Sequence, residues 1–422
     1  MENHSTTAPT AATEPLFAGD DWFDPVEANL RGRVRSFLEA MFEAELDAAL
    51  SRKRYERRRR SAVDGTDGEE ETTLAGHRHG HRQRTLVGTF GPVEISVPRA
   101  RLHKEDGTNA EWKSTALRRY QRRTRDIDAL ITSAYLAGTN TRRVKRVLGA
   151  LFRDAVGKDV VSRVWRKLKT DWEAWAKRDL AKEEIVRIIL DGTVVRALLD
   201  RKSTSISLLV ALGVRADGQK ILLSVKSMGG ESEAAWRAFL DDLTSRGMSA
   251  PEFLIVDGAP GLMKALDALW PHVPRQRCTV HKHRNLLAHA PEKLHDEIGA
   301  DYTDMIYAKT AQDVLKKRKL FIAKWRLKHR PVADSLAEAG DDLFTFLRLP
   351  PEQWKSARTT NAIERLHGEF KRRIKTQAML PCAETAAMLF WALMASGQIT
   401  LRRIDGWATL PSPIDHAIDL AA

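Results

Sequence analysis

Two aspartates follow short apolar runs, and each is followed by glycine: Asp191 comes after IVRIIL and Asp257 after FLIV. Runs of this kind, rich in β-branched residues, predict strands, and the glycine predicts that the chain turns there. We therefore expect both carboxylates at strand ends, facing an open rim of a sheet. An Asp-Gly pair is also typical of an ordinary turn, so neither aspartate indicates a functional site unless other acids lie near it.

A third acid, Glu364, lies in TTNAIERLHGEFKRRIK, where residues 359–361 can cap the start of a helix. Three carboxylates from two strands and a helix can hold two divalent ions about 3.5–4 Å apart. Mg²⁺ or Mn²⁺ prefers oxygen ligands and keeps water that a phosphate can replace. One ion would activate a water or a 3′-hydroxyl, and the other would stabilise a leaving 3′-oxygen. The three acids thus predict a two-metal site for phosphodiester chemistry.

The sequence RCTVHKH places Cys278 three residues before His281, with His283 nearby. Such a pair is half of a zinc site, but zinc needs two further ligands, and Cys382 is the only other cysteine in the chain. The alternative is a buried cysteine at a strand end with a histidine that is bonded to the backbone. The pair therefore leaves both a chemical and a structural role open.

The chain has 422 residues, and its 69 Lys+Arg against 56 Asp+Glu give a net charge of +13. Basic residues are concentrated in four stretches, at 52–60, 113–125, 141–170 and 315–330. Clusters of this kind neutralise phosphates and release counterions, which favours nucleic acid over small acidic ligands. Any single stretch is also consistent with a solvated helix face. Four stretches of the same sign favour a nucleic-acid partner.

The composition excludes several classes of protein. With 43% hydrophobic residues the chain can bury a core, which excludes a wholly disordered protein, and two cysteines exclude a disulfide scaffold. The first 15 residues lack the basic and apolar regions of a signal peptide. The most apolar run, 386–395, is half the length of a membrane span and predicts a buried helix. We expect a cytoplasmic protein without a membrane partner.

The N-terminal part is expected to consist of a tail, a helix and a hairpin. Residues 1–23 are rich in Thr, Ala and Pro and are expected to be disordered, whereas residues 24–60 have a helical period. The polar stretch 61–80 is expected to be a linker. Residues 85–101 predict a hairpin around a Gly-Pro turn.

Residues 124–180 have helical periodicity and predict a helix-turn-helix module whose third helix is basic. Together with the hairpin it would form a DNA-binding region over residues 77–180. A helical bundle without a role in DNA binding is the alternative. The residues expected to contact DNA in this module are Arg142, Arg143, Arg163, Arg166 and Lys167.

From residue 185 the pattern changes to strands and short helices. Three strands precede a helix over 231–247, and two further strands, the last over 275–281, alternate with a second helix. This order predicts the first part of a ribonuclease-H-like α/β core over 185–281. An all-helical insertion over 282–357 separates it from the C-terminal part of the core over 358–405, and a tail follows at 406–422. The fold class is thus α+β and multi-domain.

Several stretches resemble the Mutator-type bacterial insertion-sequence transposases, over about residues 24–405. They are VPRAR (97–101), RRYQRRTRDIDALITSAYLAGTNTRRV (118–144), SRVWRKLKTDWEAW (162–175), LDGTVV (190–195), LIVDGAPGL (254–262), RCTVHKHRNLL (277–287) and RTTNAIERLHGEFKRRIK (358–375). The chain departs from the family at His367, where an asparagine is expected, and at Gly157, where a serine cap is usual. The stretch KTQAMLPCAETA also lacks the usual Val-Gly-Arg-Phe sequence.

The resemblance implies a ribonuclease-H-like fold in which Asp191, Asp257 and Glu364 are the catalytic acids. They would be ligands to two Mg²⁺ or Mn²⁺ ions in each active site. Cys278 and His281 match the family's motif of Cys or Asp, two residues and His. The resemblance favours a place for His281 near the DNA phosphate or the transition state, and it leaves the role of Cys278 open.

The resemblance also implies a DNA transposase, which binds the terminal inverted repeats of its element, cleaves DNA strands and transfers them to target DNA. The partner is therefore double-stranded DNA, and holding two element ends requires at least a homodimer. In a bacterial cell such a protein is nucleoid-associated when it is bound to DNA. Two alternatives remain: a transposase-derived DNA-binding protein that does not cut, and a nuclease without strand transfer.

Further contacts with DNA are expected outside the helix-turn-helix. Trp325 lies in the basic stretch 315–330, where its ring can either stack on a flipped base or belong to the core of the insertion. The basic end of the helix that carries Glu364 adds three expected DNA contacts, Arg372, Arg373 and Lys375.

Overall fold

The computed structural model describes residues 25–53, 76–104, 107–136, 158–199, 202–375, 380 and 382–420. They form two units: an N-terminal unit of residues 1–135 and 139–165, and a C-terminal unit of residues 136–138 and 166–422. Within the described residues, no helix has the length and apolar character needed to cross a membrane.

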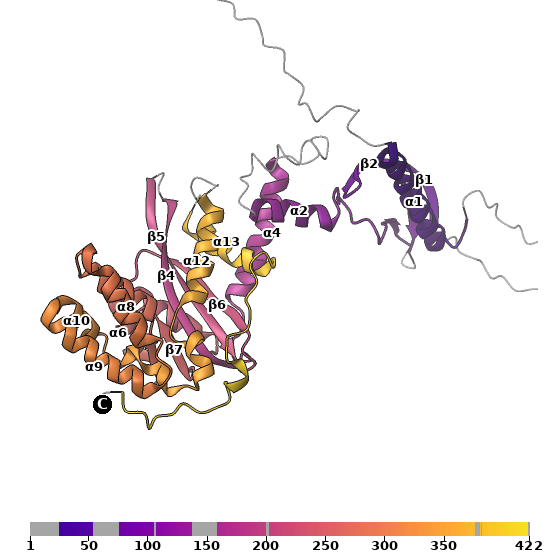
Figure 1. Ribbon diagram of the computed structural model, residues 1–422. Coiled ribbons are helices and arrows are strands. Elements are labelled where there is room, and N and C mark those ends of the chain that lie inside the picture. The colour runs from indigo at the N-terminus through magenta and orange to yellow at the C-terminus, as the bar shows by residue number, and fades with distance from the viewer. Residues whose placement is uncertain are drawn as a thin grey trace, which may run out of the picture. The chain divides into compact units, whose positions relative to one another are not determined.

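The N-terminal unit has one long helix on a small antiparallel sheet (Figure 1). Helix α1 (Pro25–Leu50) packs on the strands β1 (Gly76–Gly88) and β2 (Gly91–His103), and β3 (Asn109–Glu111) pairs with β2. Alternating apolar residues explain this packing, because Leu86, Val93 and Ile95 bury their side chains against Phe42 of the helix.

The predicted hairpin is confirmed, but its turn and its length differ from the prediction. Gly88 pairs with Gly91, so the turn is Thr89–Phe90, and Gly91 already belongs to β2. Residues 76–80 were expected to be linker, yet they form the first part of β1. This part is held by ion pairs, since Arg78 pairs with Glu43 and Asp47 of α1. Composition alone hides such pairing, because the same polar residues are typical of linkers.

The helix-turn-helix remains a prediction. Its first and third helices correspond to α2 (Arg125–Leu136) and α4 (Lys158–Ala176). The middle helix, with Arg142 and Arg143, lies outside the described residues, as does the side chain of Arg163.

The C-terminal unit is built on a five-stranded sheet in the order β6-β5-β4-β7-β8. The strands β4 (Ile185–Leu199), β5 (Lys202–Arg215) and β6 (Lys220–Met228) form an antiparallel meander. The short strands β7 (Phe253–Val256) and β8 (Arg275–Arg277) extend it in parallel from the edge of β4. The predicted strands are thus present, and their β-branched residues fill a sheet that is buried on both faces.

Helices cover both faces of this sheet. The helices α5 (Glu233–Ser245) and α6 (Pro260–Leu269) bury Trp236, Phe239 and Leu262 against strand residues such as Leu190 and Val256. The hydroxyl of Ser232 caps α5 by accepting from the N–H of Ala235. The helices α12 (Asn361–Ile374) and α13 (Ala383–Ala395) contact β4, and α13 is buried over almost its whole length, which confirms the helix predicted over 386–395.

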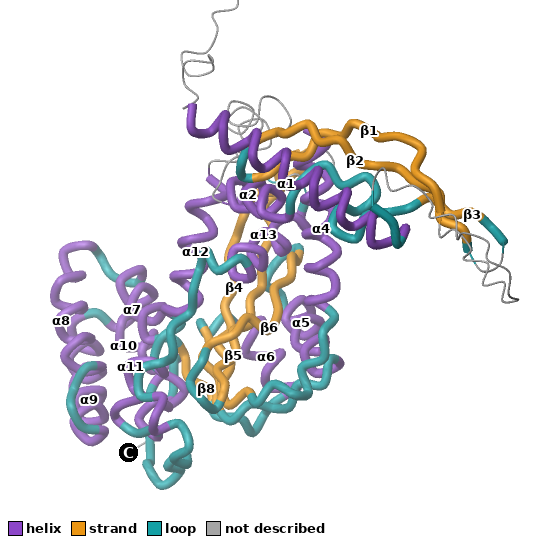
Figure 2. The backbone as a smooth tube through the Cα atoms, turned by 90° about the vertical axis from the view of Figure 1, so that its right-hand side faces the viewer, coloured by secondary structure: helices purple, strands orange, loops and turns teal. Residues whose placement is uncertain are grey.

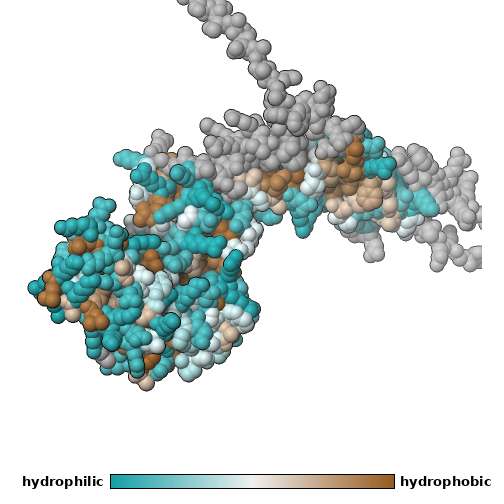
Figure 3. All heavy atoms as spheres, viewed as in Figure 1, coloured by the Kyte–Doolittle hydropathy of each residue, from teal (hydrophilic) through white to brown (hydrophobic). Residues whose placement is uncertain are grey.

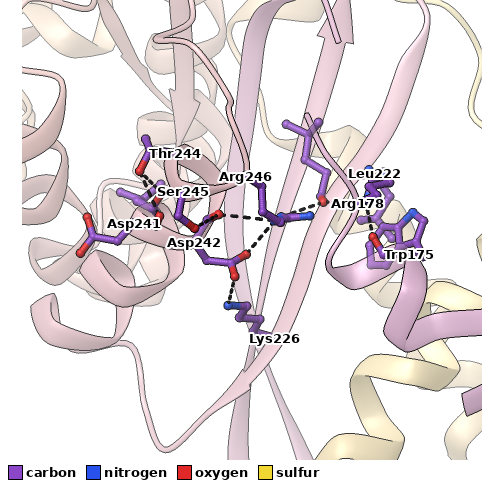
Figure 4. Close-up of polar contacts among 11 residues, drawn as sticks. Trp175, Arg178, Leu222, Lys226, Asp241, Asp242, Thr244, Ser245 and Arg246 are labelled. Carbon is purple, nitrogen blue, oxygen red and sulfur yellow. Dashed lines mark hydrogen bonds and ion pairs between the residues drawn. The ribbon is translucent and has the colours of Figure 1, made fainter. Parts of the chain in front are cut away.

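Two arginines fasten the end of α4 and the end of α5 to β6, as Figure 4 shows. Arg178 donates to the carbonyl oxygens of Trp175 and Leu222, at 3.1 and 2.7 Å, and Arg246 pairs with Asp242 at 3.1 Å. Burial lowers the pKa of Arg178 to about 10, so this guanidinium stays charged near neutral pH. These contacts hold the C-terminal ends of α4 and α5 against β6.

The described elements between residues 282 and 357 are all helical, as predicted. The helices α7 (Thr279–Ala288), α8 (His295–Ile306), α9 (Ala311–Lys328) and α10 (Arg330–Glu338) pack together, and the single turn α11 (Trp354–Ala357) follows them. Figures 1 and 2 show α8 and α9 standing to one side of the strands. On the face drawn in Figure 3 this unit is largely hydrophilic, with scattered hydrophobic residues.

Two expectations about this helical group are wrong. The strand expected over 275–281 ends at Arg277, and α7 begins at Thr279, so the β-branched Thr279 and Val280 belong to a helix whose cap is Cys278. Trp325 is fully buried, and its Nε1–H donates to Asp301 at 2.9 Å. In this structure the ring therefore belongs to the core and is not accessible for stacking on a base.

Candidate active site

Asp191 and Asp257 lie side by side where β7 ends. Leu190 of β4 is the register partner of Val256, the last residue of β7. In the sequence, Asp191 directly follows Leu190 and Asp257 directly follows Val256. Asp257 therefore ends its strand as expected. Asp191 does not, because β4 continues to Leu199 on its long ladder with β5, in which Asp191 faces Val210. Because β7 ends at Val256, the edge of β4 beyond Leu190 has no partner in β7.

The two aspartates form a pair of like charges in which Asp191 is buried and Asp257 is half-buried. Asp191 is 4% exposed, and its Oδ1 accepts from the N–H of Gly192 at 3.0 Å. Burial raises the pKa of Asp257, a hydrogen bond from the N–H of Ala259 opposes this effect, and the charge of Asp191 adds to it. Negative charge held together in this way attracts a cation.

Glu364 lies in the first turn of α12 and has two cationic neighbours. Both of its oxygens accept from the guanidinium of Arg284, at 3.2 and 3.3 Å. One oxygen also lies 3.3 Å from Nε2 of His281. His281 and Arg284 are three residues apart on α7, so they lie on the same helix face.

His281 lies at the centre of the acids. A hydrogen bond with Cys278 raises the pKa of His281 to about 9, burial opposes this effect, and the charges of Cys278, Asp191 and Glu364 support it. The charge of His281 in turn lowers the pKa of Asp257. The imidazole thus interacts with all three acids, and its described partners are side chains rather than backbone carbonyls.

Cys278 connects the start of α7 to the start of α12. Its thiol is 1% exposed and accepts from the N–H of Thr360 at 3.3 Å. Burial raises the pKa of the thiol, but hydrogen bonds from His281 and Thr360 outweigh it, so that the pKa is lowered overall. Thr279 donates from both its N–H and its hydroxyl to the carbonyl oxygen of Arg358, at 2.9 and 3.1 Å. We call these contacts between 278–279 and 358–360 the clasp.

The acids fit a hard divalent ion better than the neighbouring residues fit zinc. Ligand atoms of Cys278, His281 and Glu364 lie within 4.8 Å of one another, which makes three zinc ligands in the described residues, and Cys382 does not join them. Asp191 and Asp257 offer adjacent carboxylates without a Lys or Arg partner in the described part of the chain. Glu364 would complete an oxygen site by exchanging its contacts with Arg284 and His281.

Two residues at this site were not expected there from the sequence. Glu231 lies over Gly192, where an added Cβ would come within 2.5 Å of its carboxylate. Burial raises the pKa of Glu231, and the charges of Asp257 and Asp191 raise it further. His367 stands out in the sequence only as a departure from the family. Its Nδ1 lies 3.4 Å from Asp191, and both side chains are buried.

The basic residues expected to contact DNA have different surroundings. Arg166 and Lys167 are exposed on α4. Arg372 and Arg373 both pair with Glu369, and Lys375 is exposed after the end of α12.

Comparison with known proteins identifies the family. The family model "Transposase, Mutator family" matches residues 21–399. The transposase for insertion sequence element ISRM5 of Rhizobium meliloti (strain 1021) is 29% identical over 387 residues, which cover 92% of this chain and 90% of that protein. The transposase for IS905 of Lactococcus lactis is 26% identical, covering 85% of this chain and 86% of that protein. The transposase for IS256 in transposon Tn4001 of Staphylococcus aureus is also 26% identical, covering 80% and 85%.

The family match spans most of the chain, including every residue of the acidic site described above. The resemblance found in the sequence motifs is thereby confirmed. The chain belongs to the Mutator family of transposases.

Proposed function

We propose that this protein is an insertion-sequence transposase with a ribonuclease-H-like catalytic core and a DDE active site of Asp191, Asp257 and Glu364. The observation that supports it most directly is the meeting of all three acids around His281 at the end of β7. The strand order, an antiparallel meander extended by two parallel strands, is typical of that fold.

Asp191 and Asp257 would hold Mg²⁺ or Mn²⁺, with Glu364 as the third ligand and Glu231 as an additional carboxylate beside them. Two such ions supply activation of the attacking water or hydroxyl and stabilisation of the leaving 3′-oxygen. His281, protonated near neutral pH, would donate to the scissile phosphate. His367 would orient Asp191 from the opposite side.

The DNA substrate would be the terminal inverted repeats of the element together with target DNA. The N-terminal region, residues 77–180, would bind the element ends, and a dimer or larger assembly would bring two ends together. The protein would act in the bacterial cytoplasm on the nucleoid. A DNA-binding protein without catalysis is disfavoured because the acids are complete and juxtaposed, whereas a nuclease without strand transfer would use the same site.

The test uses the full-length protein and a labelled duplex that carries one element end. The variants Asp191→Asn, Asp257→Asn and Glu364→Gln keep the shape of each side chain but remove the charge that holds the metal. We expect each to lose Mg²⁺-dependent cleavage while it still binds the end DNA. Asp241→Asn, which changes an exposed acid on α5, is the matched control and should cleave normally.

An active Asp257→Asn protein would refute the acidic triad. Joining of the cleaved end to a target plasmid separates the remaining alternatives. Cleavage without any joined product would identify a nuclease rather than a transposase.

A further inference from the structure

A pocket of about 310 Å³ opens in the N-terminal unit, between β1 and residues 119–122. Arginines line both sides: Arg82 and Arg84 come from the strand, and Arg119 and Arg122 from the segment after β3. All four lie within the DNA-binding region expected over residues 77–180, but none was singled out from the sequence as a DNA contact. We call this feature the arginine pocket.

The pocket has a fixed frame. Arg84 is half-buried and donates to the carbonyl oxygen of Gln121 at 2.5 Å and to that of Arg118 at 3.4 Å. Backbone hydrogen bonds of 2.9 Å join Val87 to Arg122 and to Thr124. The segment that carries half of the arginines is therefore docked on β1.

Tyr120 lies at the apex of this docked segment in a strained conformation. Its φ is +67°, in the left-handed region that bulky residues rarely adopt. The ring is 72% exposed, and the guanidinium carbon of Arg119 lies 5.0 Å from its centroid. A hydrogen bond from the N–H of Gln121 to the carbonyl oxygen of Arg118 closes the turn around it. The strain is retained because the surrounding contacts fix the turn.

The positive charges of the pocket are not compensated. None of its four arginines makes an ion pair with an acid among the described residues, and Arg82, Arg119 and Arg122 are exposed. Burial lowers the pKa of Arg84, and the nearby charges of Arg82 and Arg122 lower it further. Glu111 is close enough to interact with the charge of Arg119, but it pairs with Arg99 at 2.9 Å.

Some other arginines of the same unit are paired with acids. Arg78 pairs with Glu43 and Asp47, and Arg123 pairs with Asp128 at 2.9 Å. The pocket arginines differ from these paired arginines in that no acid forms an ion pair with them among the described residues. Like charges held together without a counter-ion are stabilised by an anion.

We propose that the arginine pocket binds the phosphate backbone of duplex DNA. Guanidinium groups donate paired N–H groups that match a phosphate, and several exposed arginines on two segments suit a row of phosphates better than one enclosed anion. The inference rests on the proposed function, in that DNA is the substrate. It adds a contact surface that reads no base sequence and that fixes the N-terminal unit on the duplex.

The test measures DNA binding of the full-length protein by fluorescence anisotropy at several salt concentrations. The triple variant Arg82→Gln, Arg119→Gln, Arg122→Gln removes the three exposed charges and leaves the framework residue Arg84 intact. We expect at least about tenfold weaker binding. The slope of log affinity against log salt should decrease by about 0.9 for each phosphate that the variant no longer neutralises. The loss of affinity should be equal on end DNA and on an unrelated duplex.

Two controls accompany it. Arg33→Gln removes an exposed arginine of α1, outside both the pocket and residues 77–180, and should bind as the wild type does. The corresponding triple lysine variant keeps the charge and should retain most of the salt slope. Thermal unfolding checks that the variants are folded, and the single variants Arg119→Gln and Arg122→Gln replace the triple variant if it is not.

Unchanged binding by the folded glutamine variants, while the wild type binds and cleaves end DNA, would overturn the arginine pocket and leave the proposed function intact. A loss confined to one DNA sequence would overturn the assignment to phosphates. Competition by inorganic phosphate equal to that by duplex DNA would show a small-anion site instead. A wild-type protein that binds no duplex would refute the proposed function itself.

Discussion

In α9, four lysines and arginines of the basic stretch 315–330 pair with acids, whereas the four arginines of the arginine pocket form no ion pair within the described residues. Lys317 pairs with Asp304 at 2.6 Å, and Lys324 pairs with both Asp301 and Glu297. Lys328 and Arg318 are also paired. In the sequence the two regions have the same signal, a dense basic run. The difference shows that uncompensated charge, rather than charge density, distinguishes a candidate DNA surface from an ion-paired helix face.

The largest expected effect comes from Trp325, whose substitution tests whether α9 belongs to the protein core or to the DNA interface. Trp325→Ala should lower the free energy of unfolding by about 3–5 kcal/mol, because the ring is fully buried and its N–H is bonded to Asp301. DNA affinity of the folded protein should not change. Urea denaturation and anisotropy on one preparation measure both, with Trp325→Phe as the control that keeps most of the packing. A stable variant with weakened DNA binding would place α9 in the DNA interface.

His281 extends the comparison to a cation that is surrounded by acids and that the proposed function places beside the scissile phosphate. His281→Ala should lower the rate of single-turnover cleavage by about 10²-fold, or roughly 2.7 kcal/mol, because it removes a donor to the transition state. DNA affinity should change little, in contrast to the variants of the arginine pocket. A destabilised protein with an undiminished cleavage rate would instead assign His281 a purely structural role.

The charge of His281 can also be followed by pH. Because its folded pKa of about 9 lies above the ordinary value of 6.5, protonated His281 stabilises the fold fully below pH 6.5, and the effect is lost as the pH rises through about 9. The wild type should therefore exceed His281→Gln in unfolding free energy by about 1–3 kcal/mol at pH 6 and by much less at pH 9.5. A pH-independent difference would contradict the ion-pair assignment, and Cys278→Ser should shift the transition to lower pH.

The smallest effect is expected for the paired lysines of α9, which allow a direct comparison with the arginine pocket. The double variant Lys324→Gln, Lys328→Gln removes two charges from α9 that are already paired with acids. Exposed pairs contribute little to stability, so the thermal midpoint should be almost unchanged. The salt slope of DNA binding should also match that of the wild type. A slope as reduced as that of the arginine-pocket variants would show that pairing in the free protein does not predict the DNA surface.

Local patterns were sufficient for much of the fold. The β-branched runs predicted the strands near their observed bounds, and the helix expected over 231–247 is α5. The acids at the end of β7 were also expected from sequence. The sequence did not predict that Asp191 lies within a strand that continues beyond it. The continuation depends on the pairing of β4 with β5, which is a tertiary contact rather than a local preference.

The other features that the sequence did not predict also depend on tertiary contacts. The sequence around Cys278 favours a strand by composition, but its position at the cap of α7 depends on the hydrogen bond of its N–H to Val256. Glu231 belongs to no recognisable sequence motif. The only related signal in the sequence is Gly192, whose lack of a side chain leaves room for the Glu231 carboxylate. Whether the basic residues of 113–125 and 315–330 are paired depends on which acids the fold brings beside them.

The clasp has a consequence for the architecture of the chain. It joins residues 278–279 to residues 358–360, so the helical group between them leaves the core and returns to it at nearly the same point. An insertion whose ends are fastened together can change in length or content without displacing the helix that comes after it. The position of Glu364 relative to the aspartates is therefore set by these bonds together with the packing of α12 on β4. A change in the length of the outer helices α8 and α9 would leave both of these anchors of α12 in place.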